Sequence, residues 1–247
     1  MTSTDEVPDA DAALVAGKQP ASARIPLDRD RIITAAIEFI DRQGLPGLTM
    51  RRLGESLGVE AMSLYRYVPG KEDLLDAVVD SLVLSMAKDE DVLDTPRDGW
   101  QDFLVRLAHG VRRVALQHPK AFPLVASRPP EAPWLRPPLR SIDWVEDFLD
   151  GLISEGFTDE SAVAGYRAFT SFLLGHLLLE VATNGGDIGP LDVIDDGSPG
   201  YDNLDAAPTV RRLRDALSED RASVEFEVAL ELLLDRLALL RSEGSTD

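Results

Sequence analysis

The sequence predicts an all-α fold with a small N-terminal part and a larger C-terminal part. Apolar residues recur at the spacing of one helix face through most of the chain. Almost no segment alternates polar and apolar residues as a strand does, and Gly, Pro and Asp gather between the helical segments. We therefore divide the chain into a tail of residues 1–23, a first domain of residues 24–88 and a second domain of residues 89–247.

Composition limits the classes of protein to which the chain can belong. Its 247 residues are 44% hydrophobic, enough for a sizeable core, and carry a formal net charge of -19. This charge opposes general binding to polyanions, so a nucleic-acid role needs basic residues gathered on one face. The absence of cysteine excludes disulfides and thiolate metal sites. With neither a signal-peptide pattern nor a run of about 18 apolar residues, we expect a cytoplasmic protein without a membrane span.

The first domain is expected to contain four helices after a flexible acidic tail. Gly44 stops the first helix, Thr49 is a natural N-cap for the second, and Gly58 ends it. Pro69 and Gly70 turn the chain before a longer fourth helix. The expected helices cover residues 28–43, 50–57, 61–67 and 71–87.

The second domain is expected to consist of a charged connector followed by five helical segments. Before the last two segments, a stretch rich in Gly, Asp and Pro predicts a long loop over residues 184–205. The connector covers residues 89–98, and the helices cover about 99–117, 139–155, 159–183, 208–218 and 222–242.

The second and third helices, joined by Gly58-Val59-Glu60, have the layout of a helix-turn-helix. Residues 49–71 carry four basic side chains against two acidic ones, unlike the chain as a whole. Packing of Leu53 against Leu64 would turn the other face of the third helix outward, where it suits a DNA major groove. The alternative is that its tyrosines pack and its charges are solvated.

Several side chains near this third helix have the chemistry to bind DNA. An Arg can bond a phosphate or a guanine edge, Ser and Tyr hydroxyls can bond phosphate oxygens, and a Met can touch a thymine methyl. A helix N-terminus offers amides to a phosphate, and a Lys beside one adds charge. These candidates are Thr49, Met62, Ser63, Tyr65, Arg66, Tyr67 and Lys71.

Residues 28–87 resemble the DNA-binding domain of the tetracycline-repressor (TetR) family. The resemblance lies in the segments IITAAIEFIDRQG, GLTMRRLGESLGV and LYRYVPGKEDLL. In that family the third helix reads a double-stranded DNA operator, and the Tyr and Lys at the third helix and at the start of the fourth commonly contact phosphates. The resemblance therefore implies DNA contacts at Thr49, Arg51, Ser63, Tyr65 and Lys71.

The second domain resembles, more loosely, the regulatory domain of the tetracycline repressors. Residues 159–183 and 222–242 are similar to the two helices that family members pair across a homodimer interface. The residues themselves agree, because both segments are apolar on more than one face and must be buried on several sides, in a large core or against a partner. A dimer would place two reading helices roughly 34 Å apart, which fits a palindromic operator.

The resemblance also implies an effector pocket whose occupant moves the fourth helix. The family's magnesium-binding His falls where this sequence has Leu124 or Val125, although Glu180 matches an acidic position of the family. We therefore expect a small, partly apolar effector other than magnesium–tetracycline. The candidate pocket residues are Trp100, His109, Arg113, His118, Phe122, Trp144, Phe148, Phe172, His176 and Glu180.

Motifs of other functions are missing. The sequence has no Walker A sequence, no G-x-S-x-G elbow and no GxGxxG after a strand, and its three histidines lack metal-site spacing. Residues 192–203 have Ile194 at the third position of a calcium loop, where an oxygen ligand is needed, and Asn203 at the twelfth, where a bidentate Glu is needed. We expect no catalytic residue, metal or cofactor.

The sequence thus predicts a ligand-responsive transcriptional regulator, a repressor that a small-molecule inducer releases from its operator. The alternatives are an all-α small-molecule-binding enzyme or a protein-interaction module, each with a vestigial helix-turn-helix.

Overall fold

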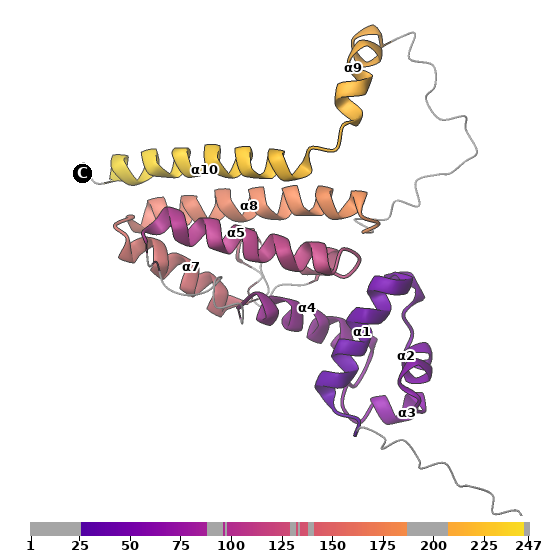
Figure 1. Cartoon of the computed structure of the whole chain (residues 1–247). Coiled ribbons are helices and arrows are strands. Elements are labelled where there is room, and N and C mark those ends of the chain that lie inside the picture. Colours follow the sequence, from indigo (N-terminus) through magenta and orange to yellow (C-terminus); the bar gives the residue numbers. More distant parts are fainter. Residues whose placement is uncertain are drawn as a thin grey trace, which may run out of the picture.

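The computed structural model describes residues 26–87, 96, 98–128, 132, 134–137, 141–186 and 207–244. In these residues the protein consists of α-helices and one short 3-10 turn, without a strand, which confirms the predicted fold class (Figure 1). The helices are α1 (Arg29–Gln43), α2 (Met50–Leu57), α3 (Ala61–Leu64), α4 (Lys71–Ala87), α5 (Trp100–Gln117), α6 (Pro123–Ser127), α7 (Ile142–Ser154), α8 (Asp159–Thr183), α9 (Pro208–Ser218) and α10 (Ala222–Gly244), with the 3-10 turn at Leu45–Gly47.

The first four helices form a small bundle in which α1 packs against α2 and α4, and α2 packs against α3. Asp28 caps α1 by accepting a hydrogen bond from the Arg31 amide at 2.8 Å. The isoleucines of α1 are buried, and so are Leu53 of α2 and Leu64 of α3, which are both 0% exposed. Burial of one apolar face from each helix therefore holds the bundle together.

Helix α4 joins this bundle to the rest of the protein. Its first turns pack on α1, and its later turns contact α5 and α6 (Figure 1). Helices α5, α7 and α10 each pack against α8, which forms the centre of the second part of the molecule. Helix α9 stands away from these helices in Figure 1, and all eleven of its residues are exposed.

One local prediction was wrong, and one short helix was not predicted. The third helix was expected over residues 61–67, but α3 ends at Leu64 and residues 65–67 form a turn in which the Tyr67 amide donates to Leu64 O. The short helix α6 was not predicted, because five residues beginning with Pro123 are too few to show a helical period. The expected tail (1–23), most of the connector (89–95 and 97) and most of the long loop (187–205) lie outside the described residues.

Helix α8 is long and apolar enough to cross a membrane, with a mean hydropathy of 1.3 over its most apolar 18-residue window. Length and composition alone are weak evidence for a span, and α8 packs against α5, α7 and α10 as a core helix does. Only 39% of that window is buried within one chain. The rest of its apolar surface is therefore available to a partner.

Tyr166 of α8 should make stability fall at high pH. Its hydroxyl donates to Pro137 O at 3.0 Å, and burial of the side chain raises its pKa to about 12. Because the phenol ionises at about 10 in the unfolded chain, its contribution is complete below that pH and is lost as the pH rises toward 12. We expect wild-type protein to lose about 1 kcal/mol more than Tyr166→Phe between about pH 9.5 and pH 11 in urea unfolding. Equal losses in the two proteins would contradict this assignment.

Candidate functional site

Three local features fix the geometry of the helix-turn-helix: a cap at the start of α2, a left-handed glycine at its end, and a close contact between the backbones of α2 and α3. The Thr49 hydroxyl accepts a hydrogen bond from the Arg52 amide at 3.2 Å and so starts α2. Gly58 ends α2 with φ at 70°, in the left-handed region that glycine adopts without strain. At Gly54 a Cβ would lie 2.9 Å from Val59 O and 3.1 Å from the Ala61 amide nitrogen, so α2 and the start of α3 touch through backbone.

The outer surface next to this contact carries three large exposed side chains. Met62 is 72% exposed, Tyr65 43% and Tyr67 40%. Ser63 is half-buried on α3, whereas Tyr65, Arg66 and Tyr67 lie in the turn that follows it. Flexible apolar and phenolic groups held out in water are typical of a surface that binds a partner.

Some basic residues around this surface have partners within the protein, and others do not. Arg51 pairs with Glu55 at 2.9 Å on the exposed side of α2, and Arg52 donates to Gly47 O at 2.7 Å while its guanidinium lies 5.1 Å from the centre of the Phe39 ring. Arg52 therefore stabilises the bundle. Among the described residues, Arg66 and Lys71 have no ion-pair or hydrogen-bond partner, so their charge is available to an anion.

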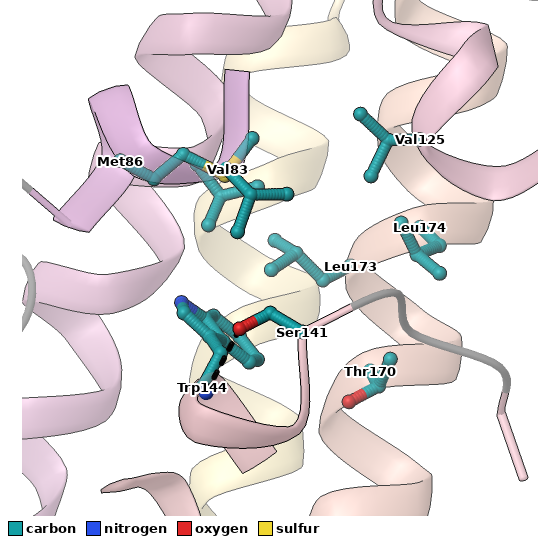
Figure 2. A pocket seen from close by; sticks show the side chains of 9 residues that line it. Val83, Met86, Val125, Ser141, Trp144, Thr170, Leu173 and Leu174 are labelled. Carbon is teal, nitrogen blue, oxygen red and sulfur yellow. Dashed lines mark hydrogen bonds between the residues drawn. The ribbon is translucent and has the colours of Figure 1, made fainter. Parts of the chain in front are cut away.

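A largely apolar cavity lies where α4, α5, α6, α7 and α8 meet (Figure 2). It encloses about 480 Å³ of space between atoms, part of it open to solvent. Side chains narrow it, so only about 40 Å³ is wide enough to hold the centre of a water molecule. Apart from Trp144, sequence reasoning missed its lining, since buried aliphatic residues look alike in a helical pattern whether they face a neighbour or a hollow. The lining residues are Val83, Met86, Val111, Val125, Ser141, Trp144, Thr170, Leu173 and Leu174.

Three predicted pocket aromatics besides Trp144 belong to the packed core. Trp100 makes an edge contact with Phe157 at 5.2 Å between ring centres, and Phe122 is 0% exposed. Phe148 touches the rings of Trp144, Phe103, Tyr166 and Phe169. Arg113 lies on the exposed side of α5.

Four more of the predicted pocket residues gather around Phe226 of α10, which is 0% exposed. The rings of His109, Phe172 and His176 lie 5.3–5.9 Å from the Phe226 ring. Glu180 pairs with Arg112, whose guanidinium lies 5.0 Å from the same ring. These contacts fasten α10 to α5 and α8.

Arg112 is the polar centre of this cluster, and sequence reasoning missed it. Its Nη2 donates to Glu180 Oε1 at 2.5 Å and to Ser223 Oγ at 2.8 Å, and its Nε donates to Glu180 Oε2 at 3.0 Å. The hydrogen bonds with Glu180 raise the pKa of Arg112. The Glu180 carboxylate is thus already paired with the Arg112 guanidinium, so it is not available as a metal ligand in this arrangement.

Two polar bridges connect the second part of the protein to the helix-turn-helix part. His118, also a predicted pocket residue, contacts Asp41 of α1 at 2.7 Å between Nδ1 and Oδ2. Arg128, directly after α6, donates to Asp76 at 2.5 Å and to Glu72 at 2.6 Å on α4. Burial alone would lower the pKa of Arg128, but the two carboxylates outweigh burial and raise it. Helices α1 and α4 are therefore tied to the α5–α6 segment.

Comparisons with known proteins identify the family. Residues 32–78 match the model of bacterial regulatory proteins of the tetR family, and residues 94–240 match the tetracyclin repressor-like C-terminal domain. The chain belongs to the TetR family. Its relatives include the HTH-type transcriptional repressor DrrR1 of Streptomyces coeruleorubidus, at 32% identity over 160 residues, and the tetracycline repressor protein class A from transposon 1721 of Escherichia coli, at 28% identity over 217 residues.

These TetR-family matches differ in how much of each protein they cover. The match to DrrR1 covers 64% of this chain and 56% of that protein, and the match to the class A repressor covers 87% and 92%. The crystal structure of the Streptomyces coelicolor TetR family protein ActR in complex with actinorhodin is similar over 87% of this chain and 98% of that one, with a TM-score of 0.63 and 25% identity.

Proposed function

We propose that this protein is a homodimeric transcriptional repressor that binds a palindromic DNA operator and is released from it by a small-molecule inducer. The observation that carries the proposal is the helix-turn-helix of α2 and α3, with Met62, Tyr65 and Tyr67 exposed beside the unpaired charges of Arg66 and Lys71. Membership of the TetR family supports it. The operator, the inducer and a cytoplasmic location belong to the proposal.

DNA contacts in this proposal follow from where each predicted residue lies. Met62 and Ser63, on α3, face the bases, whereas Tyr65, Arg66, Tyr67 and Lys71 surround α3 and bond phosphates. Thr49 and Arg51 approach the backbone from the start of α2. The Arg51–Glu55 pair is exposed at both side chains, so Arg51 can exchange its carboxylate for a phosphate at little cost.

A dimer follows from the apolar surface that α8 and α10 leave uncovered. Leu179 of α8 is 67% exposed, and Val224, Val228 and Leu232 of α10 are 50–64% exposed. Helices α8 and α10 lie side by side and pack against each other (Figure 1). A second copy of this surface would complete a four-helix bundle and bury these side chains.

Coupling between effector and operator follows from the walls of the cavity. Val83 and Met86 come from α4, whose first residue is Lys71. Lys71 borders the reading surface, which we define as Met62, Ser63, Tyr65, Arg66 and Tyr67. An occupant larger than the present hollow must displace these side chains and the end of α4. Binding then favours a spacing of the two reading heads that does not fit the operator.

Substitutions on the reading surface test the proposed function. In fluorescence anisotropy with DNA from upstream of its own gene, Tyr65→Phe should weaken binding to all sequences by about 5–150-fold, because the dimer loses one phosphate hydrogen bond from each protomer. Met62→Ala should change the preference between operator variants. Leu84→Ala, on the exposed side of α4 at 55% exposure, is the control and should leave both unchanged. If the protein selects no sequence at low salt, the proposed function is wrong.

Removal of Arg128 should loosen the start of α4. Arg128→Gln leaves Asp76 and Glu72 without their cation, and we expect a loss of about 1–2 kcal/mol in unfolding free energy because both carboxylates are partly exposed. Hydrogen exchange of the α4 amides should quicken. Arg128→Lys keeps the charge but cannot donate to both carboxylates in the geometry of a guanidinium. Its unfolding free energy should therefore lie between those of wild type and Arg128→Gln. Unchanged exchange in Arg128→Gln would show that the bridge does not hold α4.

A further inference from the structure

The cavity between α4 and α8 has a chemistry that selects its occupant. Among the residues that the structure describes, the nine that line the cavity carry no charge, and six of them are aliphatic or Met. An ionised ligand would lose its hydration there without gaining a counter-ion, which is a large cost. The occupant is therefore uncharged and mostly apolar.

The three lining residues that carry polar groups lie toward one end of this cavity. Figure 2 shows Ser141, Trp144 and Thr170 toward one end in this view, and Val83, Met86 and Val125 toward the other. Ser141 Oγ already accepts a hydrogen bond from the Trp144 amide at 3.2 Å, which leaves its O–H free to donate. Tyr166, one turn before Thr170, gives its own O–H to Pro137 O.

One buried donor at this end lacks a partner. Trp144 Nε1 is enclosed and forms no hydrogen bond with the described residues, although Trp144 is only 8% exposed. The Thr170 hydroxyl, by contrast, interacts with the Tyr166 hydroxyl. A buried donor without an acceptor is costly, and native structures rarely keep one without a reason. An indole N–H can only donate, so the missing group is an acceptor.

We propose that the cavity binds an uncharged, largely ring-shaped or aliphatic molecule carrying a ketone- or quinone-type oxygen, which accepts a hydrogen bond from Trp144 Nε1. The proposal rests on the proposed function, because it names the inducer class of the same site. Met86, unbranched and flexible, is the side chain that such a molecule displaces first, and it carries the change into α4.

Three tricyclic probes of nearly equal shape test this ligand class: 9-fluorenone, which has a ketone oxygen, fluorene, which has no acceptor, and fluorene-9-carboxylate, which is charged. Equilibrium dialysis against the full-length protein gives each affinity. We expect fluorenone to bind about tenfold more tightly than fluorene, because one buried donor gains its acceptor. The carboxylate should not bind measurably.

Variants test which side chain donates the hydrogen bond to the ligand oxygen. Trp144→Phe keeps a ring but removes the N–H, so it should bind fluorenone and fluorene equally. Trp134→Phe changes a tryptophan that is 76% exposed and should keep the full preference. Circular dichroism on each variant confirms that it is folded.

The outcomes separate the ligand class from the function. Tighter binding of the carboxylate, equal binding of fluorenone and fluorene by wild type, or no binding of fluorenone would overturn the ligand class. A preference that survives in Trp144→Phe would overturn the role of Trp144. Sequence-selective DNA binding, measured on the same protein stock without probe, fails only if the proposed function fails.

Discussion

Gly54→Val should abolish most operator binding while leaving the second part of the protein folded. A Cβ at this position already meets Val59 O at 2.9 Å and the Ala61 Cα at 3.3 Å, and these are backbone atoms that cannot rotate away. The two further methyl groups of Val then force α3 away from α2. Overpacking of this kind costs about 1–3 kcal/mol, and the same free energy taken from DNA binding weakens it by about 5–150-fold.

Ser56→Val is the matched control for this change. It places the same β-branched residue on the same helix, but Ser56 lies on the exposed side of α2. Ser and Val have similar helix propensities, so the control change by itself should cost little. Anisotropy titrations and thermal unfolding of both variants compare them directly. Gly54→Ala should also weaken DNA binding, but less than Gly54→Val, because its single Cβ already lies 2.9 Å from the backbone oxygen of Val59. Wild-type affinity in Gly54→Val would mean that α3 does not read DNA in this arrangement.

Local sequence signals predicted most of the helices because each signal has a local physical cause. Thr49 caps α2 and Gly58 ends it in a left-handed conformation, as expected from their side chains. The segment 159–183 was predicted to be one helix, and α8 has those bounds. The third helix was overextended, since Tyr65 and Tyr67 fit a helical pattern but the backbone begins to turn before Pro69.

The candidate site was harder to predict because it depends on contacts between distant segments. Arg112 meets Glu180 across 68 residues and Arg128 meets Asp76 across 52, and nothing local marks either arginine as different from a solvated one. Large aromatics were expected to line the pocket, yet Phe148 fills the core, and Val83 lines the cavity. The DNA contacts remain a prediction that rests on the exposed surface around α3.

Arg112→Met should destabilise the protein more than any surface change, by about 3–5 kcal/mol, because it leaves a buried carboxylate without its cation. The Glu180 side chain is only 5% exposed and that of Arg112 15%, so water can do little to replace the lost partner. The change also removes the hydrogen bond to Ser223 and the cation over the Phe226 ring, which hold the start of α10. Urea unfolding at one fixed protein concentration measures the loss, since a dimer's stability depends on concentration.

A double variant shows whether the loss comes from the unpaired charge or from packing. Arg112→Met combined with Glu180→Leu removes both charges and keeps the site filled, and replacement of a whole buried pair by apolar groups is often close to neutral. We therefore expect the double variant to recover most of the stability that Arg112→Met loses. If both proteins are equally unstable, the anchoring of α10 through Ser223 and Phe226, and not the pairing of charges, is what Arg112 supplies. Size-exclusion chromatography would then show a smaller fraction of dimer in both variants than in wild type, because α10 forms part of the surface that the proposed dimer uses.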